Sequence, residues 1–289
     1  KPRLKEIRAM IDAGEYFTMN KARQYGKTTI LRALTDFLKR DYIVVSMDFQ
    51  RIGASKFKTE NIFSATFARD FIKKAEAGNQ LEAEVLMPLK KVLEEQENRI
   101  ELYELFSCLI EICAKAGKPV VLIIDEVDSA SNNQVFLVFL AQLRACYLDR
   151  DTTPTFWSVI LAGVYDIRNI RQKIRSDAEH KMNSPWNIAA KFQVDMSFSA
   201  QEIAGMLKEY EADYHTGMDI EKISQMIYAY TSGYPYLVSC LCKNMDEEVA
   251  GTEKFPDKSC AWTQAGFIEA VKLLINDNNT LFQSLTGKL

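Results

Sequence analysis

The strongest constraint on this chain is a Gly-Lys-Thr tripeptide that stands between a strand pattern and a helix pattern. Residues 15–20 (EYFTMN) are typical of a short strand, and residues 27–39 carry apolar side chains at helical spacing. The loop between them, residues 21–26 (KARQYG), leads directly into the helix. Backbone N–H groups at a helix start bind phosphate oxygens well, because the helix dipole also favours negative charge there. The segment therefore predicts a strand–loop–helix unit that binds phosphate.

Each residue of this segment has a role in the predicted chemistry, since the segment ends like the P-loop pattern G-x-x-x-x-G-K-[ST]. Gly26 lets the backbone approach the phosphates, Lys27 neutralises the β- and γ-phosphates, and the hydroxyl of Thr28 ligates Mg²⁺. Lys21 stands where the pattern has its first glycine, and Gly-Lys-Thr alone also fits an ordinary helix start with a solvent-facing lysine. The residues expected to contact the nucleotide are Arg23, Gln24, Tyr25, Gly26, Lys27, Thr28 and Thr29.

A second pattern, residues 119–126 (PVVLIIDE), is a strongly apolar strand that ends in two acids. Such a strand carries Asp125 to the carboxyl edge of a parallel sheet, where it can hold Mg²⁺ directly or through water. Glu126 is the candidate general base for the attacking water. Alone, the pattern also fits a buried strand that ends in a solvated acidic turn. Its combination with the Gly-Lys-Thr segment favours one site for a nucleoside triphosphate and Mg²⁺.

Hydrolysis of the nucleotide also needs a cation near the charge that develops on the γ-phosphate. Three arginines follow the fourth predicted strand and are candidates, of which Arg168 comes first, but they equally fit a solvated basic helix face. These arginines are Arg168, Arg171 and Arg175. The candidates for a residue that senses the γ-phosphate are Ser158, Tyr165 and Asp166, and the sequence does not choose among them.

Strand and helix patterns alternate over the first two thirds of the chain. The predicted strands are residues 15–20, 42–49, 119–125, 155–162 and 191–196. This alternation predicts a three-layer α/β/α domain with a parallel sheet. From Ser199, which is a good helix N-cap with Glu202 three residues later, only helix patterns follow. The expected organisation is an α/β core over residues 1–198 and a small helical lid subdomain over residues 199–289.

Composition narrows the class of protein further. With 47% hydrophobic and 26% charged residues, the chain is expected to fold as a soluble globule. The formal net charge of −3 argues against a broad basic surface for nucleic acid. The six cysteines are expected to be free, and two histidines exclude a multi-histidine metal centre. No apolar run reaches the ~20 residues of a membrane helix and the first residues lack a signal peptide, so a cytoplasmic location without a membrane partner is expected.

Several segments together resemble the bacterial AAA-ATPase-like family, which is related to the AAA+, STAND and archaeal-type P-loop ATPases. The resemblance covers about residues 10–250 and is carried by FTMNKARQYGKTTIL, VVLIIDEVD, SVILAGVYDI, NSPWNIA and TSGYPYLVSCLCK. It implies ATP and Mg²⁺ as ligands and a sheet of order 5-1-4-3-2, with the fourth strand between the P-loop strand and the acidic strand. It also implies that Pro235, in the Gly-x-Pro element at residues 233–235, faces the nucleotide and reports its state to the lid.

The resemblance leaves three functions open. The first is an ATP-dependent conformational switch that hydrolyses ATP slowly and drives a partner protein, a further C-terminal domain or a second copy of the chain. The second is an ATP-dependent helper of DNA processing, because members of the family often carry a PD-(D/E)XK nuclease-like domain after the ATPase. No such acidic-lysine core stands in the last hundred residues of this chain. The third is a scaffold that binds nucleotide without hydrolysis, which Lys21 in place of glycine keeps open. ATP is expected over GTP because the guanine-reading N-K-x-D pattern is missing.

Overall fold

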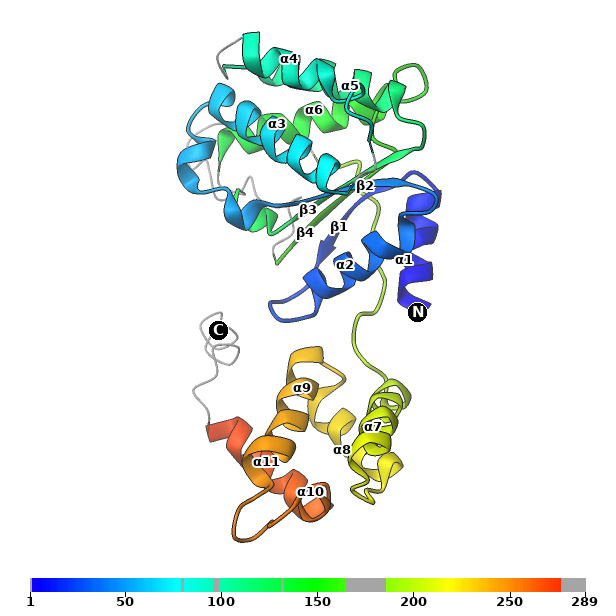
Figure 1. Cartoon of the computed structure of the whole chain (residues 1–289), viewed down its shortest axis with the longest axis vertical. Helices are drawn as coiled ribbons and strands as arrows, with labels where there is room; N and C mark the ends of the chain where they lie inside the picture. The colour runs from blue at the N-terminus through cyan, green and yellow to red at the C-terminus, as the bar shows by residue number, and fades with distance from the viewer. Residues whose placement is uncertain (1, 79–80, 96–98, 131–132, 165–185, 277–289) are drawn as a thin grey trace. The chain divides into compact units, whose positions relative to one another are not determined.

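The chain divides into two compact units (Figure 1). The computed structural model describes residues 2–78, 81–95, 99–130, 133–164 and 186–276. The first unit comprises residues 1–22 and 27–194, and the second comprises residues 23–26 and 195–289. The tip of the loop that precedes the Gly-Lys-Thr helix is thus grouped with the helical residues late in the chain. The predicted boundary at residue 198 stays a prediction about domain organisation.

A parallel sheet of four strands lies at the centre of the first unit. The strands are β1 (Tyr16–Asn20), β2 (Ile43–Asp48), β3 (Val120–Asp125) and β4 (Ser158–Gly163). Their order across the sheet is β1-β4-β3-β2, and every pair is parallel. The carboxyl ends of all four strands therefore meet at one edge, and β4 lies between the loop-bearing β1 and the acidic β3. The predicted α/β class with a parallel sheet is confirmed.

The fifth strand predicted at residues 191–196 is not formed, so the described part of the sheet does not complete the order 5-1-4-3-2. One parallel bridge joins Phe17 to Ala190, whose N–H donates to the carbonyl of Tyr16 at 2.8 Å. Beyond it, the ring of Phe192 stacks on Phe17 with centroids 5.8 Å apart, and Val194 is buried. The alternating pattern of this segment reports burial of one face. A segment that forms one bridge with β1 and then diverges from it can bury alternate side chains. It does not need the full set of backbone hydrogen bonds of a strand.

Helices cover both faces of the sheet (Figure 1). One face carries α1 (Pro2–Asp12) and α2 (Lys27–Leu38). The other face carries α3 (Glu60–Ala77), α4 (Met87–Glu95), α5 (Leu102–Lys115) and α6 (Gln134–Leu148). Short 3₁₀ turns follow β2 (Phe49–Arg51 and Ala54–Phe57) and β3 (Val127–Ser129). The result is the three-layer arrangement that the alternating sequence pattern predicts.

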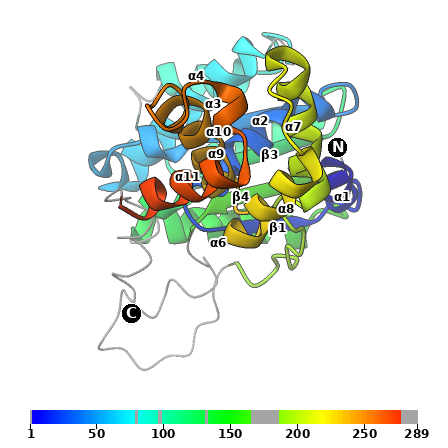
Figure 2. The same ribbon diagram turned by 90° about the horizontal axis from the view of Figure 1, so that it is seen from below.

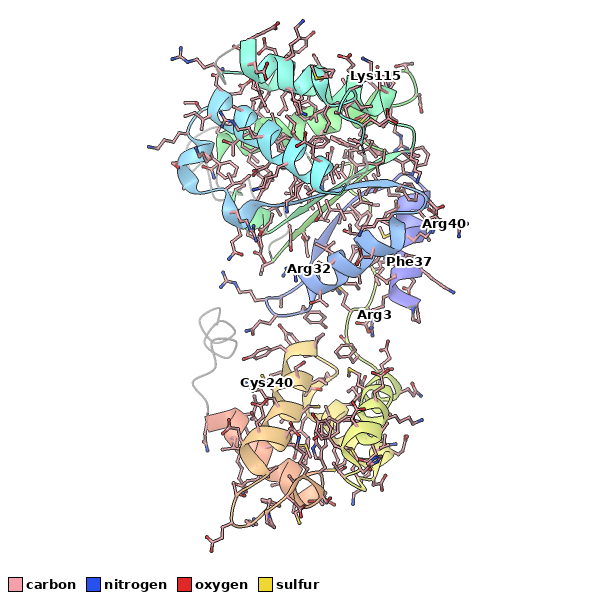
Figure 3. All side chains as sticks on the ribbon, viewed as in Figure 1. Arg3, Arg32, Phe37, Arg40, Lys115 and Cys240 are labelled. Atoms are coloured by element: carbon pink, nitrogen blue, oxygen red, sulfur yellow. The ribbon has the colours of Figure 1, made fainter. Side chains whose placement is uncertain are left out.

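Figure 3 shows side chains filling the space between the sheet and the helices on the face that carries α3 and α6. A group of buried phenylalanines belongs to this core. Phe67 and Phe139 have ring centroids 5.0 Å apart, and Phe63 lies 5.3 Å from Phe139. Phe49, directly after β2, contacts this cluster edge-on and is fully buried. Each such aromatic pair adds about 0.5–1.5 kcal/mol beyond the area that it buries. Through Phe49, the cluster packs the residue that follows β2 against α3.

The second unit is helical, and its helices can be followed in Figure 2. It contains α7 (Ala200–Tyr214), α8 (Ile220–Thr231), α9 (Pro235–Lys243), a π-helical turn (Asn244–Val249), α10 (Lys258–Ala261) and α11 (Gln264–Asn276). The predicted capping box begins α7: the N–H of Ser199 donates to Glu202 at 2.9 Å, and the N–H of Glu202 donates to Ser199 Oγ at 3.2 Å. A separate core around Trp262 and Phe267 holds the helices together.

All six cysteines are free, as the sequence predicts. Burial raises the pKa of Cys113 to about 12, and burial followed by the nearby Asp246 raises the pKa of Cys242 to about 12. Both thiols therefore stay protonated at neutral pH and are weak nucleophiles. Within the described ranges, no helix combines the length and the apolar character that crossing a membrane requires.

Gly233, between α8 and α9, occupies a position that only glycine fits. Its φ is +72°, and a Cβ built on it would lie 1.8 Å from the carbonyl oxygen of Phe198. We expect Gly233→Ala to lower the free energy of unfolding by at least about 2 kcal/mol, because the new methyl group adds strain and forces the backbones apart. Thermal or urea unfolding measures this change.

The matched control is Gly205→Ala in the middle of α7, where no atom of the described residues outside the helix's own backbone lies within 4 Å of the added Cβ. This change should stabilise the protein by about 0.5–1 kcal/mol, because alanine is the better helix former. Equal stability of the two variants would contradict the close packing of Phe198 on Gly233.

Candidate nucleotide-binding site

Two residues in the loop between β1 and α2 have left-handed backbones. Gln24 has a φ of +58° and Gly26 a φ of +75°, both in the left-handed region. Left-handed residues in a loop allow successive N–H groups to converge on one point. Among the described residues, no atom lies within 4 Å of a Cβ built on Gly26. This geometry suits the approach of phosphate oxygens to the backbone.

Lys27 is the first residue of α2, and its side chain folds back over the loop. Its Nζ donates to the carbonyls of Lys21 at 2.9 Å and Ala22 at 3.1 Å, and the residue is only 6% exposed. The ammonium group is thus held at the loop by backbone oxygens. A phosphate bears full negative charge and is a stronger partner than a neutral carbonyl. The lysine is therefore placed to exchange these contacts for an anion that enters the loop.

Thr28 and Asp125 meet at the carboxyl edge of the sheet. The Thr28 Oγ1 donates to Asp125 Oδ2 at 2.7 Å, and Asp125 Oδ1 accepts the N–H of Glu126 at 2.9 Å. A hydroxyl and a carboxylate are the hard oxygen ligands that Mg²⁺ prefers, and Mg²⁺ commonly takes its remaining ligands from phosphate and water. Nowhere in the described ranges do three His, Cys, Asp or Glu side chains gather into a metal site of their own. The hydroxyl of Thr28 and the carboxylate of Asp125 fit Mg²⁺ as a pair of oxygen ligands.

Glu126 follows β3 with a left-handed backbone, at a φ of +55°. A residue with a Cβ seldom adopts this conformation, and it costs free energy, so it often marks a functional position. The turn that follows is fixed, because the one hydroxyl proton of Ser129 is shared between the carbonyls of Phe49 and Glu126, which both lie 3.0 Å from its Oγ. The next acid, Asp128, accepts the N–H of Val164 at 2.5 Å and so holds the end of β4. Glu126 is turned out of the strand at the edge where the loop and Asp125 lie.

Of the residues predicted to sense the γ-phosphate or to supply the stabilising cation, the structure describes one. Ser158 is at the amino end of β4, where its Oγ donates to the carbonyl of Glu15 at 2.6 Å. This is the end of the sheet opposite the loop, so the interpretation of Ser158 as a sensor is wrong. The other candidates, Tyr165, Asp166, Arg168, Arg171 and Arg175, lie outside the described residues.

The tip of the loop belongs to the second unit through aromatic and hydroxyl contacts. The hydroxyls of Tyr25 and Ser197 are 2.6 Å apart and share a hydrogen bond. The rings of Tyr25 and Tyr234 pack edge to face, with centroids 4.6 Å apart at 75°. The hydroxyl of Tyr234 donates to the carbonyl of Arg23. Burial, followed by the nearby Tyr25, raises the pKa of Tyr234, so this hydroxyl keeps the proton that it donates.

Sequence analysis identified Pro235, which lies next to these contacts, but it missed Tyr234 and Ser197, which make them. Pro235, predicted to face the nucleotide, is the first residue of α9 and directly follows Tyr234. Tyr234 is the middle residue of the Gly-x-Pro element, so a closer reading of that element could have identified it. Ser197 carries no comparable signal, because it precedes α7 in a segment without a motif.

The fold is that of the P-loop ATPase class. A Walker-type ATPase of Pyrococcus abyssi matches with a TM-score of 0.60 and 17% identity, over 100% of this chain and 75% of that protein. The chain belongs to the AAA-like domain family, whose profile matches residues 4–267. This confirms the AAA-type resemblance of the sequence motifs.

Two further solved structures share the fold. The Orc1 protein of Aeropyrum pernix, solved in complex with DNA, matches with a TM-score of 0.52 and 8% identity, over 94% of this chain and 64% of that protein. The Orc2 protein of the same organism, solved in its ADP form, matches with a TM-score of 0.51 and 12% identity, over 93% and 66%. The chain thus spans just under two thirds of these two proteins. No curated protein matches the sequence.

Proposed function

We propose that this chain binds ATP with Mg²⁺, hydrolyses it slowly and acts as a nucleotide-dependent conformational switch. The observation that carries this proposal is the hydrogen bond between Thr28 of α2 and Asp125 of β3, at 2.7 Å, beside the lysine of the same loop. Two segments far apart in the sequence bring the ligands of one phosphate-bound cation to one edge. Membership of the AAA-like domain family supports the same reading.

In this proposal, the loop backbone and the start of α2 bind the phosphates. Lys27 leaves the carbonyls of Lys21 and Ala22 and pairs with the β- and γ-phosphates. Thr28 and Asp125 hold Mg²⁺ by their oxygens, and Mg²⁺ when bound neutralises the charge that develops on the phosphates. The further contacts that we propose come from Arg23, Gln24, Tyr25, Gly26, Thr29 and Pro235.

Glu126 is the proposed general base of hydrolysis. Its carboxylate takes a proton from a water molecule as the water oxygen bonds to the γ-phosphorus. The bond between the γ-phosphorus and the bridging oxygen breaks, and its electrons stay on ADP; the proton then passes to the phosphate product. Arg168 is the proposed cation for the developing charge, from the same chain or from a second copy in an oligomer.

The loop tip gives the switch a physical connection. Residues 23–26 are covalently continuous with β1 and α2, whereas the side chain of Tyr25 hydrogen-bonds Ser197 and packs on Tyr234. A phosphate that reorganises the loop backbone acts on the carbonyl of Arg23, which accepts the hydrogen bond of Tyr234. We propose that nucleotide state changes these contacts and thereby the helical unit, so that a partner protein can read it.

Tyr25→Phe tests this connection, because it removes the hydrogen bond to Ser197 and keeps the ring. One such bond contributes about 0.5–1.5 kcal/mol, so ATP affinity should stay within about 3-fold. The difference in protease cleavage of residues 195–276 between the ATP-analogue and ADP states should shrink or vanish. Limited proteolysis with mass spectrometry measures it.

Tyr103→Phe is the matched control, since Tyr103 is 75% exposed on α5. It should leave the nucleotide-dependent cleavage pattern unchanged. If the wild-type protein binds ATP but shows the same cleavage in both nucleotide states, the proposed conformational switch is wrong. The chain would then bind nucleotide without a conformational response.

A role in DNA processing is the second candidate, and the DNA complex of the Orc1 protein is the observation that favours it. Residues 195–276 contain thirteen Asp and Glu against six Lys and Arg, a formal net charge of −7. Such a surface repels the DNA backbone, so we propose that any effect on DNA passes through a partner. A gel shift at stated salt, with and without ATP, tests direct binding; an ATP-dependent shift by this chain alone would favour the DNA role.

A further inference from the structure

Asn20 carries a buried polar atom for which the fold supplies no partner. Across the described ranges, two buried side-chain atoms have no hydrogen-bond partner, Asn20 Oδ1 and Ser64 Oγ. Such atoms are rare in native proteins, because burial takes them from water without compensation, and each calls for an explanation. Asn20 is the last residue of β1 and directly precedes the phosphate loop. Ser64 lies in α3, which packs on β2, the strand at the opposite edge of the sheet.

The strand register shows what stands beside Asn20. Side chains alternate along a strand, so Asn20 shares a face with Thr18, whose Oγ1 accepts the indole N–H of Trp186 at 2.9 Å. In the neighbouring β4, Asn20 pairs with Gly163. In β3 the last pair with β4 is Ile124 with Leu161, and Glu126 follows the end of β3 at Asp125 with a left-handed backbone. Asn20 and Glu126 therefore stand at the carboxyl ends of β1 and β3, the two strands on either side of β4.

The glycine between them is required by packing. A Cβ on Gly163 would lie 3.0 Å from both carboxylate oxygens of Asp128 and 3.0 Å from Val127. Asp128 is itself fixed by the N–H of Val164. The end of β4 thus offers no side chain between Asn20 and Glu126, and the groups next to it are held in place.

We propose that Asn20 positions the water that attacks the γ-phosphate, by accepting one of its hydrogen bonds at Oδ1. This rests on the proposed function. The oxygen can only accept, and neither an ionised phosphate nor Mg²⁺ has a proton to donate, whereas water does. With one water proton directed to Asn20 and the other to Glu126, the water lone pair is left for the phosphorus. No additional atom or electron enters the reaction. Oδ1 is buried in the structure without nucleotide, so the proposal requires that nucleotide binding rearranges the adjoining loop and admits the water to this oxygen.

The test is Asn20→Leu, which keeps the shape of the side chain and removes both polar atoms. Without nucleotide, the melting temperature should stay the same or rise, because the unpartnered oxygen is gone. The affinity for ATP with Mg²⁺ should stay within about 3-fold, and phosphate release at saturating ATP should fall by about 10- to 100-fold. The loss should therefore lie in kcat and not in KM.

Ser64→Ala is the matched control, because it removes the other unpartnered atom away from the loop. It should also keep or raise the melting temperature and should leave phosphate release unchanged. A rate for Asn20→Leu within about 2-fold of wild type overturns the proposal. A joint loss of stability and rate in Asn20→Leu also overturns it, since this outcome assigns Asn20 a structural role.

A second readout separates this proposal from the proposed function. In the wild type, Mg²⁺ with ADP and aluminium fluoride, a mimic of the transferring phosphate and its ligands, should raise the melting temperature beyond Mg²⁺ with ADP alone. Asn20→Leu should reduce that extra shift; an identical shift in both proteins overturns the water-positioning role. Failure of the wild type to bind ATP would instead overturn the proposed function itself.

Discussion

Glutamine in place of Glu126 is expected to lower phosphate release at least about 100-fold, because an amide cannot take the proton of the attacking water. The substitution keeps the size of the side chain and leaves the hydrogen bond from the N–H of residue 126 to Asp125 intact. ATP binding should therefore stay within about 3-fold of wild type. Steady-state phosphate release and equilibrium binding of labelled ATP, measured on both proteins, test this expectation.

Glu94→Gln in α4 is the control for a neutralised glutamate on the exposed surface, and it should release phosphate at the wild-type rate. An unchanged rate in Glu126→Gln would show that another group takes the proton. If neither wild type nor Glu126→Gln releases phosphate despite tight ATP binding, the chain is a nucleotide-bound scaffold or needs a partner for hydrolysis.

Removal of the ammonium group by Lys27→Ala is expected to weaken ATP binding at least about 100-fold, because charge-assisted contacts to phosphate are the strongest in such a site. In the protein without nucleotide, the same change removes the two hydrogen bonds to the loop carbonyls of Lys21 and Ala22. Stability should fall by only about 1–3 kcal/mol, since each bond contributes modestly. Binding of labelled ATP and thermal unfolding separate the two effects.

Lys39→Ala provides the matched control one residue beyond the end of α2. Lys39 is exposed and pairs with Asp36, so its loss removes a positive charge near the same helix without touching the loop. ATP affinity should be unchanged in this variant. Affinity in Lys27→Ala equal to that of wild type would contradict the nucleotide site.

The parts of the site that could be predicted are those whose chemistry is local in the sequence. Gly26, Lys27 and Thr28 form one continuous segment, and the geometry of a helix start decides what such a segment binds. Asp125 was predictable because an unbroken apolar run identifies a buried parallel strand, and the acid follows it directly. The parallel sheet brings these two segments together, as the bond between Thr28 and Asp125 shows.

Contacts between distant residues of ordinary type could not be predicted. Tyr25 and Tyr234 are 209 positions apart, and their edge-to-face packing leaves no periodic pattern in the sequence. The lack of a partner for Asn20 is likewise a property of its surroundings in the fold. The fifth strand failed for a related reason: alternation at residues 191–196 reports burial of one face, which does not require a hydrogen-bonded ladder.

The order of the strands also determines when, during synthesis, the sheet can form completely. Within the described sheet β1 pairs with β4 alone, and the hydrogen bond between Ser158 and Glu15 spans 143 residues. At about 5–20 residues per second, a ribosome takes roughly 7–30 s to make that stretch. Throughout this time β1, which leads into the phosphate loop, lacks β4 as its pairing partner. A nascent chain that has already made Lys27 and Asp125 thus lacks the strand between them, and β4 is the segment that lets the two halves of the site meet.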